Sequence, residues 1–155
     1  MKLTSAALES QLEKVRELES QLTFRIAVLS KRLDQQVVAL LKDTPLNLTS
    51  YRILVVIDTF EEISISDISR FNAIDRAQVS RTAIELEKQG LVTFRSDPSS
   101  RRKKMVVLTE AGQALLDDLH PRFEARQKKL EQGLGPEAHQ ALWQGITKLA
   151  EAVSP

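Results

Sequence analysis

The stretch Asp75–Gly90, with the sequence DRAQVSRTAIELEKQG, predicts one short amphipathic helix. Asp75 is favoured at a helix N-cap, and Gln78 occupies the capping-box position three residues later. Gly90 suits the left-handed turn that ends many helices. The residues expected to face a core recur at helical spacing: Val79, Ala83 and Leu86.

The polar face of this helix carries long hydrogen-bond donors beside one small residue, with Glu85 as a single acidic interruption: Ala77, Gln78, Arg81 and Lys88. Arginine and glutamine can each form two hydrogen bonds with one base in the DNA major groove. This composition is therefore typical of a helix that reads base edges. The alternative is a solvated face that is merely basic, and the helix alone would favour that alternative.

The sequence before this helix predicts a second, shorter one. Ser64 is a suitable N-cap and Asp67 takes the capping-box position. Residues 72–74 leave only a tight turn between the two helices, which is the spacing of a helix-turn-helix. A minimal strand is expected just before, at Ile63. The apolar residues of the short helix are expected to point inward: Ile65, Ile68 and Phe71.

The sequence after Gly90 changes from helical to strand periodicity. Residues 91–95 and 105–108 predict two β-strands. The stretch 96–104 between them, SDPSSRRKK, predicts a loop that ends in four consecutive cations. A basic hairpin directly after a helix of the recognition type is a wing, so the segment is expected to form a winged helix-turn-helix.

Charge is concentrated in the same part of the chain. Residues 70–104 contain nine basic and four acidic residues, a net charge of +5, whereas the remainder of this 155-residue chain carries −4. A positive region on a slightly acidic body is the pattern expected of a nucleic-acid-binding protein.

The N-terminal 43 residues predict a long helix. Apolar residues step by three or four from Leu8 to Leu40 without an intervening Pro or Gly, so one helix is expected over residues 5–43, with at most one break. A stripe of this length favours a partner helix from a second copy of the chain, and packing on its own domain is the alternative. A further helix is expected from a Thr49 N-cap to Phe60, although its β-branched residues also fit a strand.

The C-terminal residues predict two more helices. Thr109 is a suitable N-cap for the first, and Pro121 should kink or break it. Gly135 and Pro136 mark a stop followed by a new start. The last helix is expected to bury one apolar side and to leave Trp143 near its edge: Ala138, Leu142, Ile146, Leu149 and Val153. The expected organisation is mainly α with a small β-wing: helical dimerisation segments at 1–43 and 109–155 flank a DNA-binding domain at 44–108.

Several protein classes find no support in the sequence. The absence of cysteine removes disulfides, thiolate nucleophiles and thiol redox sensors. No stretch has the length of a membrane span or the apolar core of a signal peptide, so a cytoplasmic protein is expected. No glycine-rich phosphate loop, catalytic group or cofactor motif is present, and we expect no enzyme activity and no cofactor. His120 and His139 are interpreted as ordinary, partly exposed histidines rather than metal ligands.

The segment from Leu48 to Gly112 resembles the MarR family of winged helix-turn-helix regulators. The resemblance rests on Asp75-Arg76, Val79, Arg81, Leu86-Glu87 and Gly90-Leu91-Val92, then on Asp97-Pro98, Arg101-Arg102 and Leu108-Thr109. It implies a homodimer with interlocked terminal helices that binds palindromic double-stranded DNA as a transcriptional regulator, with repression the expected direction. It also implies that a small aromatic or anionic effector can bind between the dimer helices and the winged part.

The resemblance also implies which residues contact DNA. Family members place a wing arginine in the minor groove, which by register is Arg102, and commonly carry an acidic residue where this chain has Ser100. The alternative function is a winged helix that docks an acidic protein partner. The expected DNA-binding residues lie on the helix and on the wing: Arg76, Ala77, Gln78, Ser80, Arg81, Arg101, Arg102, Lys103 and Lys104.

Overall fold

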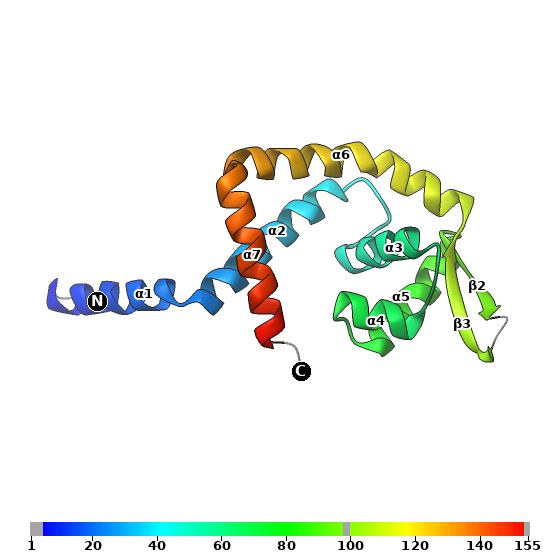
Figure 1. Ribbon diagram of the computed structural model, residues 1–155, viewed down its shortest axis with the longest axis horizontal. Helices are drawn as coiled ribbons and strands as arrows, with labels where there is room; N and C mark the ends of the chain where they lie inside the picture. The colour runs from blue at the N-terminus through cyan, green and yellow to red at the C-terminus, as the bar shows by residue number, and fades with distance from the viewer. Residues whose placement is uncertain (1–4, 98–99, 154–155) are drawn as a thin grey trace. The chain divides into compact units, whose positions relative to one another are not determined.

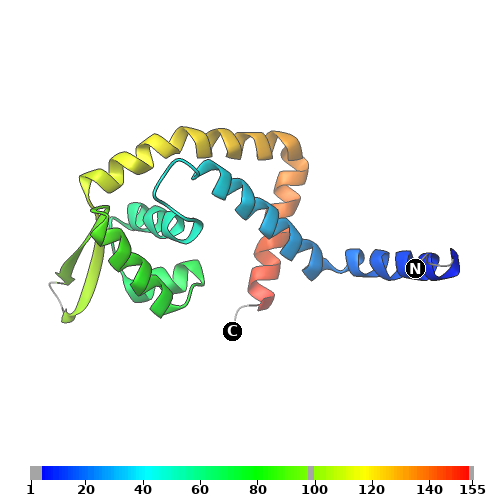
Figure 2. The same ribbon diagram turned by 180° about the vertical axis from the view of Figure 1, so that it is seen from behind.

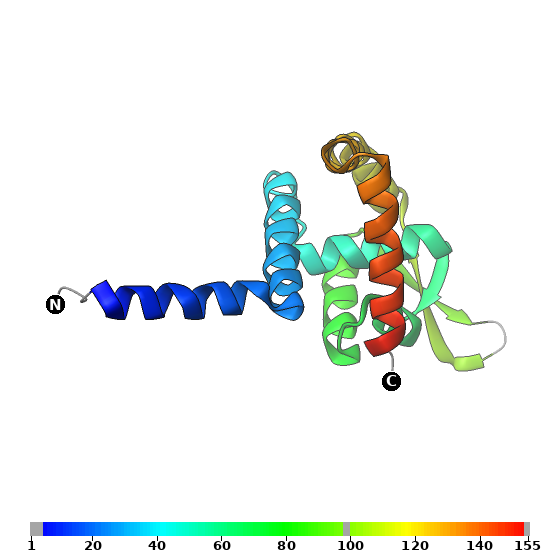
Figure 3. The same cartoon turned by 60° about the vertical axis from the view of Figure 1, so that its left-hand side comes forward.

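The computed structural model describes residues 5–97 and 100–153 and divides the chain into two compact units, one ending at Leu48 and the other beginning at Thr49. The N-terminal unit consists of α1 (Ser5–Ser20) and α2 (Leu22–Leu40). Figure 3 shows the break between these two helices.

The expected long helix therefore has its one break, at Gln21, whose backbone is extended (φ −69°, ψ 121°). The hydroxyl of Ser20 donates to the carbonyl of Glu17 at 2.7 Å. A side chain that bonds locally in this way competes with the helical ladder, which favours an end to the helix at this position. The helical pattern also ends slightly earlier than expected, at Leu40, and a turn follows.

The C-terminal unit contains the winged helix-turn-helix and two long helices (Figure 1). Three strands form one antiparallel sheet in the order β1-β3-β2. The predicted fold class, mainly α with a small β-wing, is confirmed. The elements are α3 (Leu48–Phe60), β1 (Glu62–Ser64), α4 (Ile65–Asn72), α5 (Arg76–Lys88), β2 (Val92–Asp97), β3 (Ser100–Leu108), α6 (Glu110–Leu134) and α7 (Pro136–Val153).

One apolar core holds these elements together. The run that also fitted a strand supplies the buried side of α3 through Ile53, Leu54, Val56 and Ile57, whereas Val55 is exposed. At roughly 1.5–3 kcal/mol for each fully buried aliphatic side chain, these contacts dominate the stability of the unit. The largest fully buried side chains are Ile53, Leu54, Ile57, Ile68, Leu86, Leu119, Val79, Val92 and Val106.

The predicted helix caps are confirmed for three helices. Ser64 Oγ accepts from the amide of Asp67 at 3.2 Å, and Asp75 Oδ1 accepts from Ala77 and Gln78 at 2.9 and 3.1 Å. Thr109 Oγ1 accepts from the amide of Gly112 at 3.1 Å at the start of α6. These bonds satisfy amide groups that have no partner within their own helix.

The turns between α4, α5 and β2 use left-handed residues. Ala73 (φ 51°) ends α4, and Gly90 (φ 74°) follows the last turn of α5, as predicted. The amide of Gly90 donates to Glu87 and that of Leu91 donates to Leu86, which closes the end of the helix.

Three local predictions were wrong. The helix α3 begins at Leu48, one residue before the expected Thr49 cap, so Thr49 lies in its first turn. Phe71 is 64% exposed. Ile65, Ile68 and Phe71 are spaced by three residues, and three residues fall about 60° short of a full helical turn, so Phe71 lies outside the buried face that contains Ile68. Its ring instead lies edge-on to that of Phe60, with centroids 5.2 Å apart. Helix α6 continues through Pro121, so the break, one of the two effects expected of the proline, does not occur.

The C-terminal helix α7 also differs from the prediction. Its apolar side is not buried within one chain: Leu149 is half-buried, whereas the other four residues predicted to be buried are exposed, as is Trp143 at 69%: Ala138, Leu142, Ile146 and Val153. Figure 2 shows α6 turning sharply into α7, and Gly135 is the residue that ends α6. The described residues of this unit leave the apolar side of α7 uncovered, which is the physical reason for the difference.

Candidate nucleic-acid interface

Helix α5 has one buried face and one exposed face. Val79, Ala83 and Leu86 are buried, as predicted, and fix the helix in the core. Figure 2 shows α5 lying between α4 and the β2–β3 hairpin. The helix is thereby held rigidly with its opposite face turned to solvent.

The exposed face carries most of the residues that the sequence predicted. Arg76, Ala77, Gln78 and Arg81 are exposed, and Ser80 is half-buried. Among the residues that the structure describes, the side chains of Gln78 and Arg81 have no hydrogen-bond or ion-pair partner. The Gln78 side chain does not complete a capping box, so both groups are free to bind a ligand that offers acceptors.

The far end of the exposed face is less available. Lys88 Nζ lies 3.6 Å from Glu85 Oε2, and both side chains are largely exposed. A solvated pair of this kind contributes little to stability. It does compensate the one acidic side chain on the face, so Glu85 repels a nucleic acid less than an isolated carboxylate would.

The wing is a hairpin of longer strands than the sequence predicted. Val92 pairs with Leu108, Ser96 with Lys104 and Asp97 with Ser100, with a register shift between Ser96 and Asp97. The expected nine-residue loop is wrong, because pairing with β2 continues to Lys104 and is found again at Ser100. The four cations belong to β3 instead of to a loop.

The register shift places the three residues 101–103 of β3 between two consecutive pairs of the ladder, as a bulge does. Their side chains, Arg101, Arg102 and Lys103, lie outside the described part of the structure, so their predicted roles remain predictions. Lys104 is described: its Nζ lies 5.9 Å from the centre of the Phe94 ring. A cation at this distance over an aromatic face is attracted to it. The sequence analysis missed this contact, which joins residues on opposite strands.

Thr109 joins the end of the recognition-type helix to the next helix. Its hydroxyl donates to the carbonyl of Gly90 at 2.5 Å, and its amide donates to the carbonyl of Leu91 at 3.1 Å. Gly112 reinforces the contact, because a Cβ at this position would overlap the carbonyl oxygen of Leu91. The start of α6 is therefore fixed against the end of α5.

A second contact fixes α6 against α3. The rings of Tyr51 and Phe123 are stacked, with centroids 4.2 Å apart and planes 14° from parallel. Burial raises the pKa of the Tyr51 phenol above its ordinary value of 10.0, and the charge of Arg126 opposes this in part. The sequence offered no signal for this pairing, since the two residues belong to distant helices.

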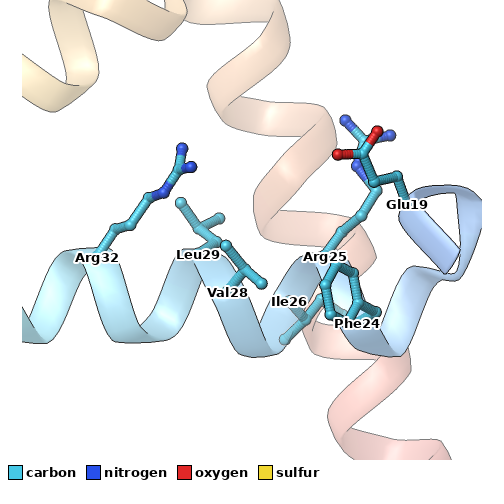
Figure 4. A pocket seen from close by; sticks show the side chains of 7 residues that line it. All are labelled: Glu19, Phe24, Arg25, Ile26, Val28, Leu29 and Arg32. Atoms are coloured by element: carbon cyan, nitrogen blue, oxygen red, sulfur yellow. The ribbon is translucent and has the colours of Figure 1, made fainter. Parts of the chain in front are cut away.

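The N-terminal unit has a hollow of about 550 Å³ along α2 (Figure 4). Its lining is half apolar and half charged, and it is open to solvent. The side chains come from the end of α1 and the first half of α2: Glu19, Phe24, Arg25, Ile26, Val28, Leu29 and Arg32. Exposed apolar residues continue along both helices, from Leu8 to Leu29.

In residues 5–97 and 100–153, no group of three or more His, Asp or Glu residues could hold a metal ion, and both His120 and His139 are exposed. No helix in the same residues is long and apolar enough to cross a membrane.

Known proteins match the chain in sequence and in structure. Residues 46–104 match the sequence model of the MarR family. The HTH-type transcriptional regulator SarZ of Staphylococcus haemolyticus is 30% identical over 95 residues, which cover 61% of this chain and 65% of SarZ. The HTH-type transcriptional regulator Hpr of a Geobacillus species is 28% identical over 116 residues, covering 72% of this chain and 58% of Hpr. The chain thus spans less than two thirds of either relative.

The structural match extends over nearly the whole chain. The crystal structure of CouR from Rhodococcus jostii RHA1, bound to p-coumaroyl-CoA, superposes with a TM-score of 0.77 at 27% identity. The match covers 89% of this chain and 95% of CouR. Together with the winged helix-turn-helix fold, these findings confirm the resemblance to the MarR family, whose sequence model residues 46–104 match.

Proposed function

We propose that this protein is a transcriptional regulator that binds double-stranded DNA through α5 and the wing. The observation that carries the proposal is the exposed face of α5, where Gln78 and Arg81 have no partner among the described residues, on a helix whose other face is buried. The Asp75 cap and the Thr109 contact hold both ends of that helix in place. A rigid helix with free donors is suited to reading base edges in a major groove.

The wing would supply contacts to the DNA backbone and the minor groove. The net charge of +5 over residues 70–104 favours approach to phosphate. Arg102 is our candidate for the minor groove, with Arg101 and Lys103 beside it. Lys104 would have a different role, because its ammonium group lies over Phe94 and stiffens the hairpin.

The regulator would act as a homodimer on a palindromic site. The apolar sides of α1 and α7 are exposed in a single chain, and Leu8, Leu142 and Ile146 are among the exposed residues. A second copy would cover these surfaces and place two recognition helices at a fixed spacing. Sedimentation of the dilute protein tests this: we expect a dimer, and a stable monomer that binds a full palindrome would contradict it.

A small aromatic or anionic effector would release the DNA, and repression would be the direction of control. CouR binds p-coumaroyl-CoA, which combines an aromatic ring with anionic groups. A ligand acts as a switch only to the extent that it prefers one spacing of the two recognition helices over the other. The absence of cysteine means that a thiol switch is not available to this chain.

Duplex selection followed by a salt titration tests the proposal. The purified protein should enrich particular duplexes from genomic fragments, and its affinity should fall steeply with salt, by a log–log slope of about 0.9 for each phosphate contact. Arg76→Ala should lower that slope, whereas Lys129→Ala, which removes a charge from the outer part of α6, should not. A flat salt response, or no affinity for any duplex, would favour the alternative of a protein-interaction module.

A further inference from the structure

The exposed face of α5 contains a large apolar side chain. Ile84 is 45% exposed, although the helix provides a buried face for aliphatic residues. It lies three residues after Arg81 and seven after Ala77, and seven residues are almost two turns of an α-helix. Ala77 and Ile84 therefore share one flank of the exposed face, next to Arg81.

The two flanks of this face differ in chemistry. One flank carries Ala77 and Ile84, which have no polar side-chain atoms. The other carries Gln78 and Glu85, again seven residues apart. Arg81 and Lys88 run between the two flanks. The helix thus offers a methyl-lined side and a hydrogen-bonding side to whatever it binds.

The major groove of DNA offers one apolar group, the C5-methyl group of thymine. An aliphatic side chain gains by burying that methyl group, which is the largest apolar group that any base edge presents in the major groove. We propose that Ile84, with Ala77, is a specificity-determining residue that contacts thymine methyl groups in the bound DNA. The inference rests on the DNA-binding function proposed above and adds a base preference to it.

The spacing of the two residues sets the scale of this contact. Seven helical residues span about 10.5 Å along the axis. Successive bases of one DNA strand are about 3.4 Å apart, so the flank covers about three base-pair steps where the helix lies along the groove. We expect one or two thymines within such a span in each half-site to be read by their methyl groups.

Replacement of thymine by deoxyuridine tests the inference, because it removes only the methyl group and keeps the hydrogen-bonding edge. Each thymine of a half-site in the selected duplex is replaced singly, and affinity is measured for the full-length protein and for Ile84→Ala. At one or two positions we expect about fourfold weaker binding by the unaltered protein, the effect of about one buried methyl group. At the same positions Ile84→Ala should respond much less.

Two controls separate methyl recognition from other effects. Val55→Ala shortens another exposed aliphatic residue, on α3, and should keep the full response to deoxyuridine. A thymine whose methyl group is read is also replaced by cytosine and by 5-methylcytosine. The unaltered protein should bind the 5-methylcytosine duplex more tightly than the cytosine duplex, whereas Ile84→Ala should show no such difference. Thermal melting should show that both variants fold.

The results distinguish this inference from the function on which it rests. Equal responses of the unaltered protein and Ile84→Ala at every replaced thymine would overturn the role of Ile84 and leave DNA binding intact. Specific duplex binding that no replacement of thymine by deoxyuridine weakens would also overturn the role of Ile84 and leave DNA binding intact. A protein that selects no duplex would overturn the proposed function and this inference together.

Discussion

The hydroxyl of Thr109 donates a hydrogen bond of 2.5 Å to the carbonyl of Gly90, 19 residues earlier in the chain. The same hydroxyl accepts from the amide of Gly112 at 3.1 Å and so caps α6. One side chain therefore closes the end of α5 and the start of α6, the helix that leads to the apolar side of α7. We expect α5 and α6 to move together.

Replacement of Thr109 by valine should separate the two helix ends. Valine keeps the shape of threonine but loses the cap and the bond to Gly90, so we expect a loss of about 1–2 kcal/mol in the free energy of unfolding. Affinity for the selected duplex should fall as well. Urea unfolding and duplex titration measure the two effects. Thr109→Ser keeps the hydroxyl and should retain most of the stability and most of the affinity for the duplex. Equal losses in the valine and serine variants would contradict the role of the hydroxyl.

The close approach at Gly112 predicts a larger effect. Alanine normally stabilises a helix by about 1 kcal/mol relative to glycine. At Gly112 its Cβ would overlap the Leu91 carbonyl oxygen, and backbone atoms cannot rotate away, so we expect a net loss of about 2–3 kcal/mol. Gly133→Ala, in the same helix with open space around it, is the matched control and should be neutral or stabilising. A stable Gly112→Ala protein with unchanged melting would show that α6 does not lie as close to α5 as described.

The pKa of Tyr51 predicts the effect of alkaline pH on stability. Burial raises its pKa in the folded state above 10.0, so near pH 10 and above the unfolded chain releases the proton more readily than the folded protein. The contribution of Tyr51 to stability is fully present below pH 10 and is lost as the pH rises through the folded-state pKa. Tyr51 is the one tyrosine of the chain, so tyrosinate absorbance reports its titration directly. Tyr51→Phe should remove this part of the loss of stability at alkaline pH. A tyrosinate titration of the folded protein with its midpoint at or below pH 10.0 would contradict the burial of Tyr51.

The local elements of the fold were predictable from sequence because their signals are local. Ser64, Asp75 and Thr109 act as caps through amides two or three residues away, and the buried face of α5 follows from helical periodicity. The same reasoning failed for Phe71, where only three residues defined the face of an eight-residue helix. A short pattern does not fix the direction of its last member.

The contacts that position the candidate site were not predictable, because they join residues that only the fold brings together. The Tyr51–Phe123 stack, the Thr109–Gly90 bond and the contact of Lys104 with Phe94 are all of this kind. The wing shows the same limit: β3 reaches back through its cations to Ser100 because β3 pairs with β2 at Lys104 and again at Ser100. The candidate base-reading residues on α5 needed only helical periodicity, and their exposed positions agree with it.

The route of regulation predicts different responses to two treatments. Mild peroxide should leave duplex binding intact, since the chain has no cysteine to oxidise. A screen of small aromatic acids and phenols should find compounds that weaken binding, measured by fluorescence anisotropy of the labelled duplex. Reversible loss of binding after peroxide would contradict the first expectation. A screen without effect would favour control by the abundance of the protein itself.

Base discrimination by Arg81 tests the central claim most directly. Affinities of the unaltered protein, Arg81→Ala and Arg81→Lys are measured for the selected duplex and for each of its single base-pair variants. We predict that both substitutions abolish a preference of about 1–3 kcal/mol at one base pair in each half-site. Arg81→Lys should still bind DNA without that preference, because lysine keeps the charge and loses the two-pronged hydrogen bonding of arginine. An Arg81→Ala protein that discriminates every base pair as the unaltered protein does would contradict the assignment of α5 as the helix that reads DNA.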